Sequence, residues 1–557
     1  MNLLDVELHK ALIEALGSAQ QAEALPPFEI PEKVTVEHPK DESLGDFATP
    51  MCMKLAGEAR MNPLRIAEIV VEYLPEMPFL DTVEVAPPGF INFRVSESWL
   101  TSQIEAILDM PDDYGKIDLG EGRRVQVEYV SANPTGPLHM GSARNAVLGD
   151  VLASVLETAG YDIQREYYVN NAGSRMQAFY ETLYARYAQA LGQDVAVPEE
   201  GYHGPYMVDI GQEIAAEHGK RFLEMPREEA LKGIGALGLE HVIEQARQDL
   251  ALLGIEYDRW FSEQSLYENG QFERVMNILQ EGGYLYEHEG ATWLKATALG
   301  GEKDEVVIRS DGTPGYFASD IAYHYNKFVE RRFDRVIDVW GADHQGHVPR
   351  MKSIMKAFSL DPARLEIIIY QLVTLKRGGE IVRLSKRTGD IVTLREVLDE
   401  VGSDAMRYFL LSHSAGSQME FDIDLAKERS QDNPVYYVQY AHARICSILR
   451  RARGIEGQAD GDVGLLTSEP EQTLIRQMLR LPEVVRLSAD LLAPHHLTYY
   501  AYELAGAFHT FYRDCRVLSS NPEDEEITKA RLKLVRACRI ALARALEIMG
   551  MKAPERM

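Results

Sequence analysis

The sequence predicts an α/β protein built on a parallel sheet, with a smaller α+β domain before it and an all-α domain after it. Residues 125–130 alternate β-branched or aromatic side chains with polar ones, which is the pattern of a strand. A helical apolar stripe follows at 147–156, and strands of buried type are expected at 336–340 and 365–370. From about residue 421 the pattern is helical to the end.

The size and composition are those of a multidomain protein. At 557 residues the chain is long enough for about three or four domains of roughly 150 residues each. No run of about 18 apolar residues exists, and the first residues lack the pattern of a signal peptide. The four cysteines are scattered without a Cys-x-x-Cys pair, so we expect no disulfide framework, no structural zinc and a reduced, cytoplasmic environment.

The net charge of −28 argues, over the whole chain, against a protein that binds nucleic acid. Residues 529–552 differ locally, because they hold seven Lys and Arg residues against one acid. Basic helices interleaved with Tyr437 and Tyr440 suit unpaired nucleotides, which stack on aromatic rings. For this segment in isolation, a helical bundle with core tyrosines and a solvated basic face is the favoured alternative.

The first domain is expected to be α+β. A helix is predicted near residues 3–16, a strand at 34–37 and a hairpin over 83–95. Core packing is the favoured role for Phe90 and Phe93 from the sequence alone.

The stretch 125–145 predicts a strand, a tight turn and a helix, with His139 and Gly141 at the helix entrance. A helix N-terminus attracts phosphate through its unpaired N–H groups and its dipole. Gly141 leaves room for a flat nucleotide base, and His139 is placed to donate to the α-phosphate. The alternative is an ordinary turn in which His139 caps the helix. A second stretch, 383–390, reads Arg-Leu-Ser-Lys-Arg-Thr-Gly-Asp and suits either a solvated loop or a mobile cationic clamp for triphosphate.

Carboxylates near the ends of the predicted strands suit a cationic ligand. Glu128 lies at the end of the first strand, with Ser131 and Asn133 just beyond it, where parallel sheets bind ligands. A guanidinium would offer Glu128 two hydrogen bonds, although a surface salt bridge is equally consistent. Tyr316 and Asp320 are four residues apart and so share a helical face, on which they could read an amino group and a cationic tail; Asp320 could instead be an N-cap.

The expected domains, in chain order, are an α+β domain at 1–108, a linker at 109–122, a catalytic domain at 123–380 with an insertion at about 174–305, a connecting segment with the Lys386 loop at 381–420, and a helical domain at 421–557.

The two loop stretches together resemble the His-Ile-Gly-His and Lys-Met-Ser-Lys-Ser signatures of class I aminoacyl-tRNA synthetases. The first is present as His139-Met140-Gly141-Ser142, with Ser142 in place of the second His. The second is present as Arg383-Leu384-Ser385-Lys386-Arg387, with Arg383 in place of the first Lys.

Within that class the chain resembles the arginyl-tRNA synthetases. The resemblance rests on the Glu128, Ser131 and Asn133 set, on Tyr316 and Asp320, on Trp-Gly-Ala-Asp-His at 340–344 and on the N-terminal domain, and it spans essentially the whole chain. It implies a Rossmann-like catalytic domain and an anticodon-binding helical bundle.

The resemblance also implies the site residues. His139 and Lys386 are expected to be catalytic. Those expected around ATP are Pro137, His139, Gly141, Ser142, Asn145, Arg383, Ser385 and Lys386. Those expected around arginine are Glu128, Ser131, Asn133, Tyr316, Asp320 and His344. Those expected at tRNA are Phe90, Asn92, Tyr437, Tyr440 and Met557.

The implied activity is ligation of arginine to its tRNA through an arginyl-adenylate, with ATP and Mg²⁺ and without a membrane partner. We expect a monomer in the cytoplasm. Two alternatives remain: a nucleotidyltransferase acting on a small acid, which would not need residues 437–557, and a non-catalytic tRNA-binding paralogue, suggested by Ser142.

Overall fold

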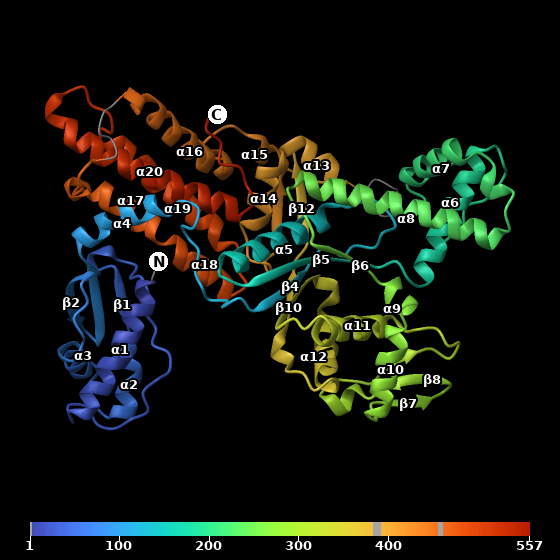
Figure 1. Cartoon of the computed structure of the whole chain (residues 1–557), viewed down its shortest axis with the longest axis horizontal. Coiled ribbons are helices and arrows are strands. Elements are labelled where there is room, and N and C mark those ends of the chain that lie inside the picture. Colours follow the sequence, from blue (N-terminus) through green and yellow to red (C-terminus); the bar gives the residue numbers. More distant parts are fainter. Residues whose placement is uncertain (1–2, 383–391, 455–459) are drawn as a thin grey trace.

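The computed structural model describes residues 3–382, 392–454 and 460–557. The protein is elongated, with the parallel sheet near its middle (Figure 1). The N-terminal domain lies at one end, beneath the C-terminal helices, and a group of inserted helices projects at the other end. No helix among the described residues is long and apolar enough to cross a membrane.

The N-terminal domain packs helices against a three-stranded antiparallel sheet of order β1-β3-β2. The predicted hairpin is confirmed as β2 and β3. The strand predicted at 34–37 is wrong: within this described stretch only Glu37 forms a single bridge, to Ala48, because the neighbouring strand β1 is three residues long. The elements are α1 (Leu4–Gln21), β1 (Phe47–Thr49), α2 (Met51–Ala59), α3 (Pro63–Glu72), β2 (Leu80–Ala86) and β3 (Phe90–Val95). Helix α4 (Glu97–Asp109) follows and packs on the C-terminal helices.

The central sheet is five-stranded and parallel, with the order β11-β10-β4-β5-β6. Its strands are β4 (Arg124–Glu128), β5 (Asp162–Val169), β6 (Arg259–Ser262), β10 (Arg335–Gly341) and β11 (Leu365–Tyr370). Helix α5 (Met140–Thr158) connects β4 to β5, as its apolar stripe predicts. Chain order reverses on either side of β4, so the carboxyl end of β4 and the start of α5 form a crevice that suits a ligand.

Two groups of elements are inserted between β5 and β10. The first contains α6 (Ser174–Ala190), α7 (Pro205–His218) and α8 (Arg227–Leu252). The chain then returns to the central sheet as β6. The second contains α9 (Gln264–Glu268), α10 (Gln271–Glu281), β7 (Leu285–His288), β8 (Ala291–Leu294), β9 (Glu305–Ile308) and α11 (Tyr316–Tyr325), which continues as a π-helical turn, Asn326–Glu330. Helix α12 (Val348–Ala357) lies between β10 and β11.

The connecting segment and the C-terminal helices complete the chain. A small sheet of order β13-β12-β14 contains β12 (Val373–Arg377), β13 (Glu380–Ile381) and β14 (Met419–Asp422). The helices are α13 (Leu394–Val401), α14 (Ser403–Leu411), α15 (Ile423–Lys427), α16 (Pro434–Arg451), α17 (Glu469–Leu479), α18 (Leu481–Asp490), α19 (His496–Asp514) and α20 (Glu525–Ile548).

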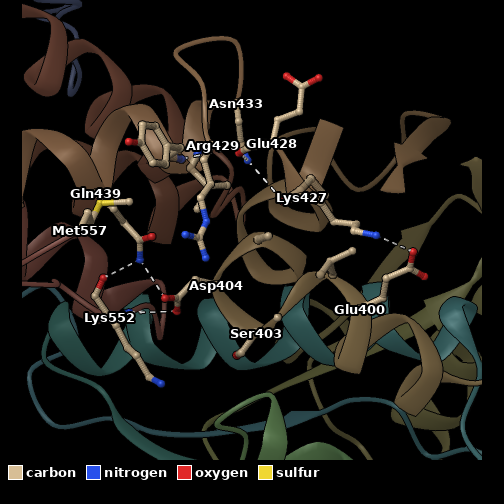
Figure 2. A pocket seen from close by; sticks show the side chains of 16 residues that line it. Glu400, Ser403, Asp404, Lys427, Glu428, Arg429, Asn433, Gln439, Lys552 and Met557 are labelled. Atoms are coloured by element: carbon tan, nitrogen blue, oxygen red, sulfur yellow. Dashed lines mark hydrogen bonds and ion pairs between the residues drawn. The ribbon is translucent and has the colours of Figure 1, made fainter. Parts of the chain in front are cut away.

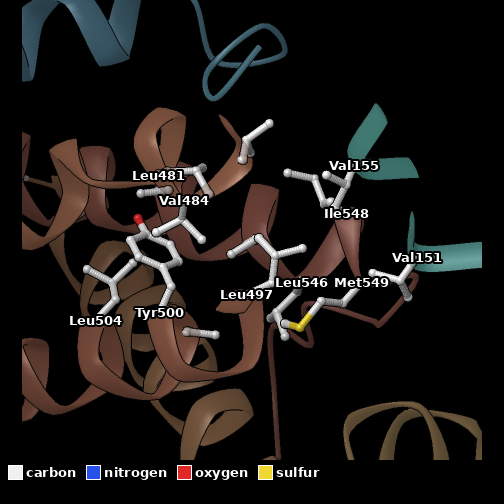
Figure 3. Packing of buried hydrophobic residues seen from close by; sticks show 14 of the residues in the cluster. Val151, Val155, Leu481, Val484, Leu497, Tyr500, Leu504, Leu546, Ile548 and Met549 are labelled. Carbon is white, nitrogen blue, oxygen red and sulfur yellow. The ribbon is translucent and has the colours of Figure 1, made fainter. Parts of the chain in front are cut away.

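One hydrophobic core joins the C-terminal helices to helix α5. Val151 and Val155 of α5 belong to the same buried cluster as Leu497, Ile548 and Met549 (Figure 3). Burial of these apolar side chains favours a fixed arrangement, because each contributes on the order of 2 kcal/mol when removed from water. The bundle is therefore packed directly on α5, the helix that His139 caps.

Candidate active site and nucleic-acid interface

The chain leaves β4 through a strained turn. Val130 and Ser131 have φ angles of 67° and 41°, a region that side chains with a Cβ rarely adopt. Two hydrogen bonds hold the turn: Val130 N donates to Asn145 Oδ1 at 2.7 Å, and Ser131 Oγ donates to Glu128 Oε1 at 3.0 Å. Strain of this kind persists where the surrounding structure fixes it, often at functional sites.

His139 caps helix α5. It is the N-cap residue, and its Nδ1 accepts a hydrogen bond from Gly141 N at 3.1 Å. A Cβ at position 141 would lie 2.9 Å from His139 Cε1, so glycine is what allows the ring to fold over the helix end. Because Nδ1 is the acceptor, the neutral ring carries its proton on Nε2. The capping role left open by the sequence is present, and in this tautomer Nε2 is the donor nitrogen of the ring.

The neighbouring predicted residues have different positions. Ser142 and Gly141 line the same cavity as His139. Asn145 also lines it but is only 4% exposed, and its amide links the turn after β4 to β10: Oδ1 accepts from Val130 N, and Nδ2 donates to Val339 O at 2.9 Å. Pro137 lies in the preceding loop, away from the cavity lining.

A cavity of about 750 Å³ lies at the carboxyl ends of β4 and β10, against the start of α5. It brings together predicted residues that are up to about two hundred positions apart in the sequence. These are Glu128, Ser131, Asn133, His139, Gly141, Ser142, Asn145, Asp320 and His344. Tyr316 begins α11, one turn before Asp320, and its side chain lies outside the described part of the structure.

Acidic side chains dominate one end of the cavity. Burial, together with the negative charges of Glu263 and Glu128, raises the pKa of Asp320 to about 8. Burial also raises the pKa of Glu263, whose Oε2 accepts no hydrogen bond among the described residues. Glu128 is paired with Lys327, whose Nζ lies 2.5 Å from Glu128 Oε2. This end of the cavity suits a cationic ligand, because a cation would stabilise the ionised carboxylates.

Glu263 is a cavity residue that the sequence analysis missed. It follows β6 directly, at the carboxyl end of a central strand. The sequence predicts an insertion at about 174–305, and β6 lies within that range. The aromatic pair Trp260-Phe261 was the available signal for a strand at this point.

His344 lies in a 3₁₀ turn, Ala342–His347, that follows β10. Its ring contacts the ring of Trp340 at a centroid distance of 6.1 Å, and its Nε2 lies 3.5 Å from Asp343 Oδ2. The side chain of His344 is 43% exposed, so it stays accessible at the mouth of the cavity.

The predicted residues Arg383, Ser385 and Lys386 lie outside the described residues. The chain that follows them is described, and it lies beside the start of α5. Thr393 forms a bridge with His139, and Leu394 N donates to Leu138 O at 2.8 Å. Thr393 also caps α13 in a capping box with Glu396.

The two tRNA-contact candidates of the N-terminal domain differ in accessibility. Phe90 begins β3 at the end of the hairpin and is half-buried. Asn92 is only 6% exposed, because β3 is the central strand of its sheet and Asn92 lies between Ala48 and Glu84. Phe90 is therefore more accessible to a partner than Asn92.

An aromatic groove of about 940 Å³ runs between α16 and α19. Tyr436 and Tyr440 are stacked at a centroid distance of 5.8 Å. The guanidinium of Arg444 lies 5.3 Å from the Tyr440 ring centroid and 4.5 Å from that of Tyr512. Tyr437 also lines the groove, so these tyrosines are at least partly accessible and are not confined to the bundle core.

A second pocket, of about 480 Å³, adjoins the groove and shares Tyr436 and Arg429 with it. Figure 2 shows the terminal Met557 at its edge, near Gln439 and Arg429. Met557 is 57% exposed, although the tail before it is anchored to α16. Gln439 Nε2 donates to Lys552 O at 2.9 Å, and Arg450 donates to Glu555 O at 2.9 Å.

The cations of residues 529–552, which the sequence suggests for nucleotide binding or for a solvated basic face, are largely paired with acids. Most of these cations form ion pairs with acids of their own helix or of neighbouring helices, so the local charge mainly holds the helices together. The ion pairs are Lys529 with Glu525 and Glu526, Arg531 with Glu471, Lys533 with Glu105, and Arg544 with Glu547. The cations that line the aromatic groove are Arg444 of α16, Arg513 of α19 and Arg429, which precedes α16.

Comparison with protein families divides the chain into three matched regions. The family of arginyl tRNA synthetase N terminal domains matches residues 6–95. The catalytic domain of class I (R) tRNA synthetases matches residues 103–414, and the DALR anticodon binding domain matches residues 438–557.

Curated proteins and solved structures are similar over most of their length. The arginine–tRNA ligase of Dehalococcoides mccartyi is 52% identical over 551 residues, which is 98% of each chain. That of Caldanaerobacter subterraneus is 49% identical over 99% of this chain and 98% of its own. A structure described as a putative arginyl tRNA synthetase from Campylobacter jejuni has a TM-score of 0.76 at 34% identity, covering 83% of this chain and 100% of its own. The Thermus thermophilus arginyl-tRNA synthetase has a TM-score of 0.78 at 22% identity, covering 100% of both chains.

Proposed function

Because this chain belongs to the arginyl-tRNA synthetase family and is an ATP-dependent arginine–tRNA ligase, we propose that arginine and ATP react in the cavity at the start of α5. The observation that carries this proposal is the position of the acidic end of the cavity, next to a helix N-terminus capped by His139. The two alternatives, a small-acid nucleotidyltransferase and a non-catalytic paralogue, are not favoured by these relatives.

The arginine side chain is assigned to the acidic end. Asp320 and Glu128 accept its guanidinium hydrogen bonds, and Glu263 adds negative charge beside Asp320. A planar guanidinium can reach two carboxylates at once, whereas the ammonium of lysine is a point charge on a single atom. Ser131, Asn133 and His344, at the rim, are assigned to the α-amino and carboxylate groups of the substrate, and Tyr316 to its side chain.

ATP is assigned to the other end, against the start of α5. The N–H groups of this helix, around Gly141 and Ser142, favour phosphate, and His139 Nε2–H is placed to donate to it. Arg383, Ser385 and Lys386 complete the set as cationic and hydroxyl donors for the triphosphate. Mg²⁺ is proposed to arrive with the ATP phosphates, which are its usual ligands in such sites, and to neutralise their charge.

The reaction needs positioning and charge neutralisation but no covalent protein nucleophile. A carboxylate oxygen of arginine attacks the α-phosphorus, and the bond to the pyrophosphate oxygen breaks. Pyrophosphate leaves with the bonding electron pair. A terminal ribose hydroxyl of tRNA then attacks the arginyl carbonyl, loses its proton and releases AMP.

The groove between α16 and α19 is assigned to the anticodon loop of the tRNA. Tyr437, Tyr440 and Arg444 offer flat surfaces on which unpaired bases stack, and Met557 edges the adjoining pocket. Phe90 is the proposed contact of the N-terminal domain. We propose that one chain acts alone, as a cytoplasmic monomer, because the same polypeptide carries both the cavity and the groove.

The test is tRNA charging by the whole protein and by Glu128→Gln. The wild type should charge its tRNA with arginine and with no other standard amino acid. Glu128→Gln keeps the size of the side chain but removes the charge, so it should raise the KM for arginine about tenfold or more, as expected for a lost charged hydrogen bond, while the KM for ATP stays within about twofold. An unchanged KM for arginine would remove Glu128 from the arginine pocket.

A further inference from the structure

Two buried carboxylates face each other across adjoining strands at the back of the cavity. Glu128 of β4 pairs in register with Asp338 of β10. Their residues are 7% and 0% exposed. Like charges opposite each other on neighbouring strands are unfavourable, and two buried carboxylates without a cation retain a proton between them. The ionised pair therefore needs a cation.

Lys327 supplies that cation from inside the protein. Its Nζ lies 2.5 Å from Glu128 Oε2 and 2.8 Å from Asp338 Oδ1, and the residue is 0% exposed. The ammonium also lies 4.2 Å from the centroid of the Tyr323 ring. Lys327 belongs to the π-helical turn that follows α11, a rare conformation that is frequent at functional sites.

Asp338, which does not line the cavity, anchors this arrangement. Its second oxygen, Oδ2, lies 2.9 Å from His324 Nε2, and His324 Nδ1 lies 2.8 Å from the carbonyl oxygen of Asp320. Burial alone would raise the pKa of Asp338, but Lys327 and His324 lower it to about 2. These contacts favour the ionised form of Asp338, whose carboxylate holds the ammonium of Lys327 in place.

Glu128 is fixed on both of its oxygens before any ligand enters. Lys327 holds Oε2, and the hydroxyl of Ser131 donates to Oε1 at 3.0 Å. Burial and the charge of Asp338 on β10 raise the pKa of Glu128, whereas Lys327 and His324 lower it. Asp320 on α11 also faces Glu128. Each carboxylate oxygen has a second lone pair, so a fixed Glu128 can still accept hydrogen bonds from the cavity side.

We propose that Lys327 is a positioning residue for arginine recognition, which keeps Glu128 ionised and oriented toward the guanidinium. This inference rests on the proposed role of Glu128 in binding arginine. A pre-oriented carboxylate favours the planar fork of a guanidinium, because no side-chain ordering is left to occur on binding. Lys327 touches neither substrate nor cofactor in this arrangement and acts through Glu128.

Removing Lys327 should change the KM for arginine and the pH dependence of that KM. Without the ammonium, Glu128 and Asp338 share a proton, which arginine must displace in order to bind. The KM for arginine should then rise about tenfold for each pKa unit by which Glu128 is raised above the assay pH. The KM for arginine should also fall more steeply with increasing pH than it does in the wild type, by up to one additional log unit per pH unit.

Three variants test this in tRNA charging by the whole protein: Lys327→Met, Asp338→Asn and the double variant Lys327→Met/Asp338→Asn. Lys352→Met is the matched control, because Lys352 is a partly buried lysine of the same domain that donates to the carbonyls of Pro362 and Leu365 and not to a carboxylate. The KM for arginine, the KM for ATP and the pH dependence of both are measured, with thermal unfolding as the check on folding.

We expect Lys327→Met to raise the KM for arginine about tenfold or more with the added pH dependence, while the KM for ATP stays within about twofold. The double variant should lose the added pH dependence, because only one carboxylate remains. Its KM for arginine should return part of the way to the wild-type value. Lys352→Met should leave the KM for arginine unchanged.

An unchanged KM for arginine in Lys327→Met overturns the inference. If Glu128→Gln raises that KM and Lys327→Met does not, the role of Glu128 stands and only the role of Lys327 fails. If neither variant changes it, the arginine pocket itself is misassigned. Should Lys327→Met fail to fold, the double variant decides: a KM for arginine equal to that of Asp338→Asn would contradict a positioning role for Lys327.

Discussion

His139 Nδ1 accepts a hydrogen bond from the backbone N–H of Gly141 at 3.1 Å, so a single side chain caps α5 and lines the cavity. The two roles are separable. Asparagine is a good N-cap residue but lacks the second ring nitrogen of histidine. His139→Asn should therefore keep a stability near that of the wild type, while its turnover falls by about 10²–10³, the cost of one donor to a developing charge.

His139→Ala is the comparison, because it loses the cap as well. It should show the same loss of turnover and a further loss of about 1 kcal/mol in the free energy of unfolding. Charging kinetics and urea unfolding measure the two effects. Wild-type turnover in His139→Asn would reduce His139 to a helix cap.

The affinity for arginine should depend on pH through Asp320. Burial, together with the charges of Glu263 and Glu128, raises the pKa of Asp320 to about 8. The guanidinium needs the ionised carboxylate, so binding expels the proton below that pH. The dissociation constant for arginine should fall as pH rises toward about 8, by up to about tenfold per pH unit, and then level off.

Calorimetric titration of arginine over this pH range measures the effect. In Asp320→Asn the group no longer titrates, so the pH dependence should flatten as the affinity falls. An affinity that is independent of pH in the wild type would show that Asp320 does not meet the guanidinium.

Removing the side chain of Arg407, which links the bundle to the catalytic domain, should lower the free energy of unfolding. This side chain is 0% exposed; it forms an ion pair with Asp150 of α5 and donates to Met549 O at 2.7 Å and to Leu253 O at 2.9 Å. Removing one partner of a buried pair leaves an uncompensated charge, so Arg407→Met should lose about 3–5 kcal/mol of stability.

Asp150→Asn, combined with Arg407→Met, removes the stranded charge. Urea unfolding should show that the double variant is more stable than Arg407→Met alone. A single variant as stable as the wild type would mean that this contact does not hold the two domains together.

Tyr440 should contribute to tRNA affinity. It is stacked with Tyr436 and lies beneath Arg444 in the groove. Tyr440→Ala should weaken tRNA binding by an amount equivalent to about 1–3 kcal/mol, the typical value of one stacked base. Tyr499→Ala is the control, because Tyr499 is an exposed tyrosine on α19, 48% accessible, that does not line the groove. Direct binding of labelled tRNA measures both, and equal affinities for the two variants would contradict the assignment.

The sequence predicted the parts of the fold that depend on local patterns. The strand at 125–130, the helix that begins at His139 and the late helical region all follow from periodicity and from the Pro and Gly residues of the turn. The resemblance added the assembly of Glu128, Asp320 and His344 around one cavity, which residues so distant in sequence do not reveal by pattern.

The features that the sequence does not predict depend on tertiary contacts. Glu263 lies in a region assigned to an insertion, and only the pairing of β6 with β5 brings it to the cavity. Lys327 looks like an ordinary surface lysine between Asn326 and Phe328, and only burial against Glu128 and Asp338 shows its role. The basic run at 529–552 is paired in a way that its own sequence does not reveal, because its acidic partners come largely from other segments.

Exchange of pyrophosphate into ATP, with cognate tRNA present, tests the central claim most directly when arginine, citrulline and lysine are compared. Citrulline has nearly the shape of arginine without its charge, and lysine has the charge without the planar fork. The acidic cavity predicts exchange with arginine alone, and a large reduction of that exchange in Asp320→Asn. Exchange with citrulline as fast as with arginine, or no exchange with arginine, would contradict recognition of a guanidinium by Asp320 and Glu128.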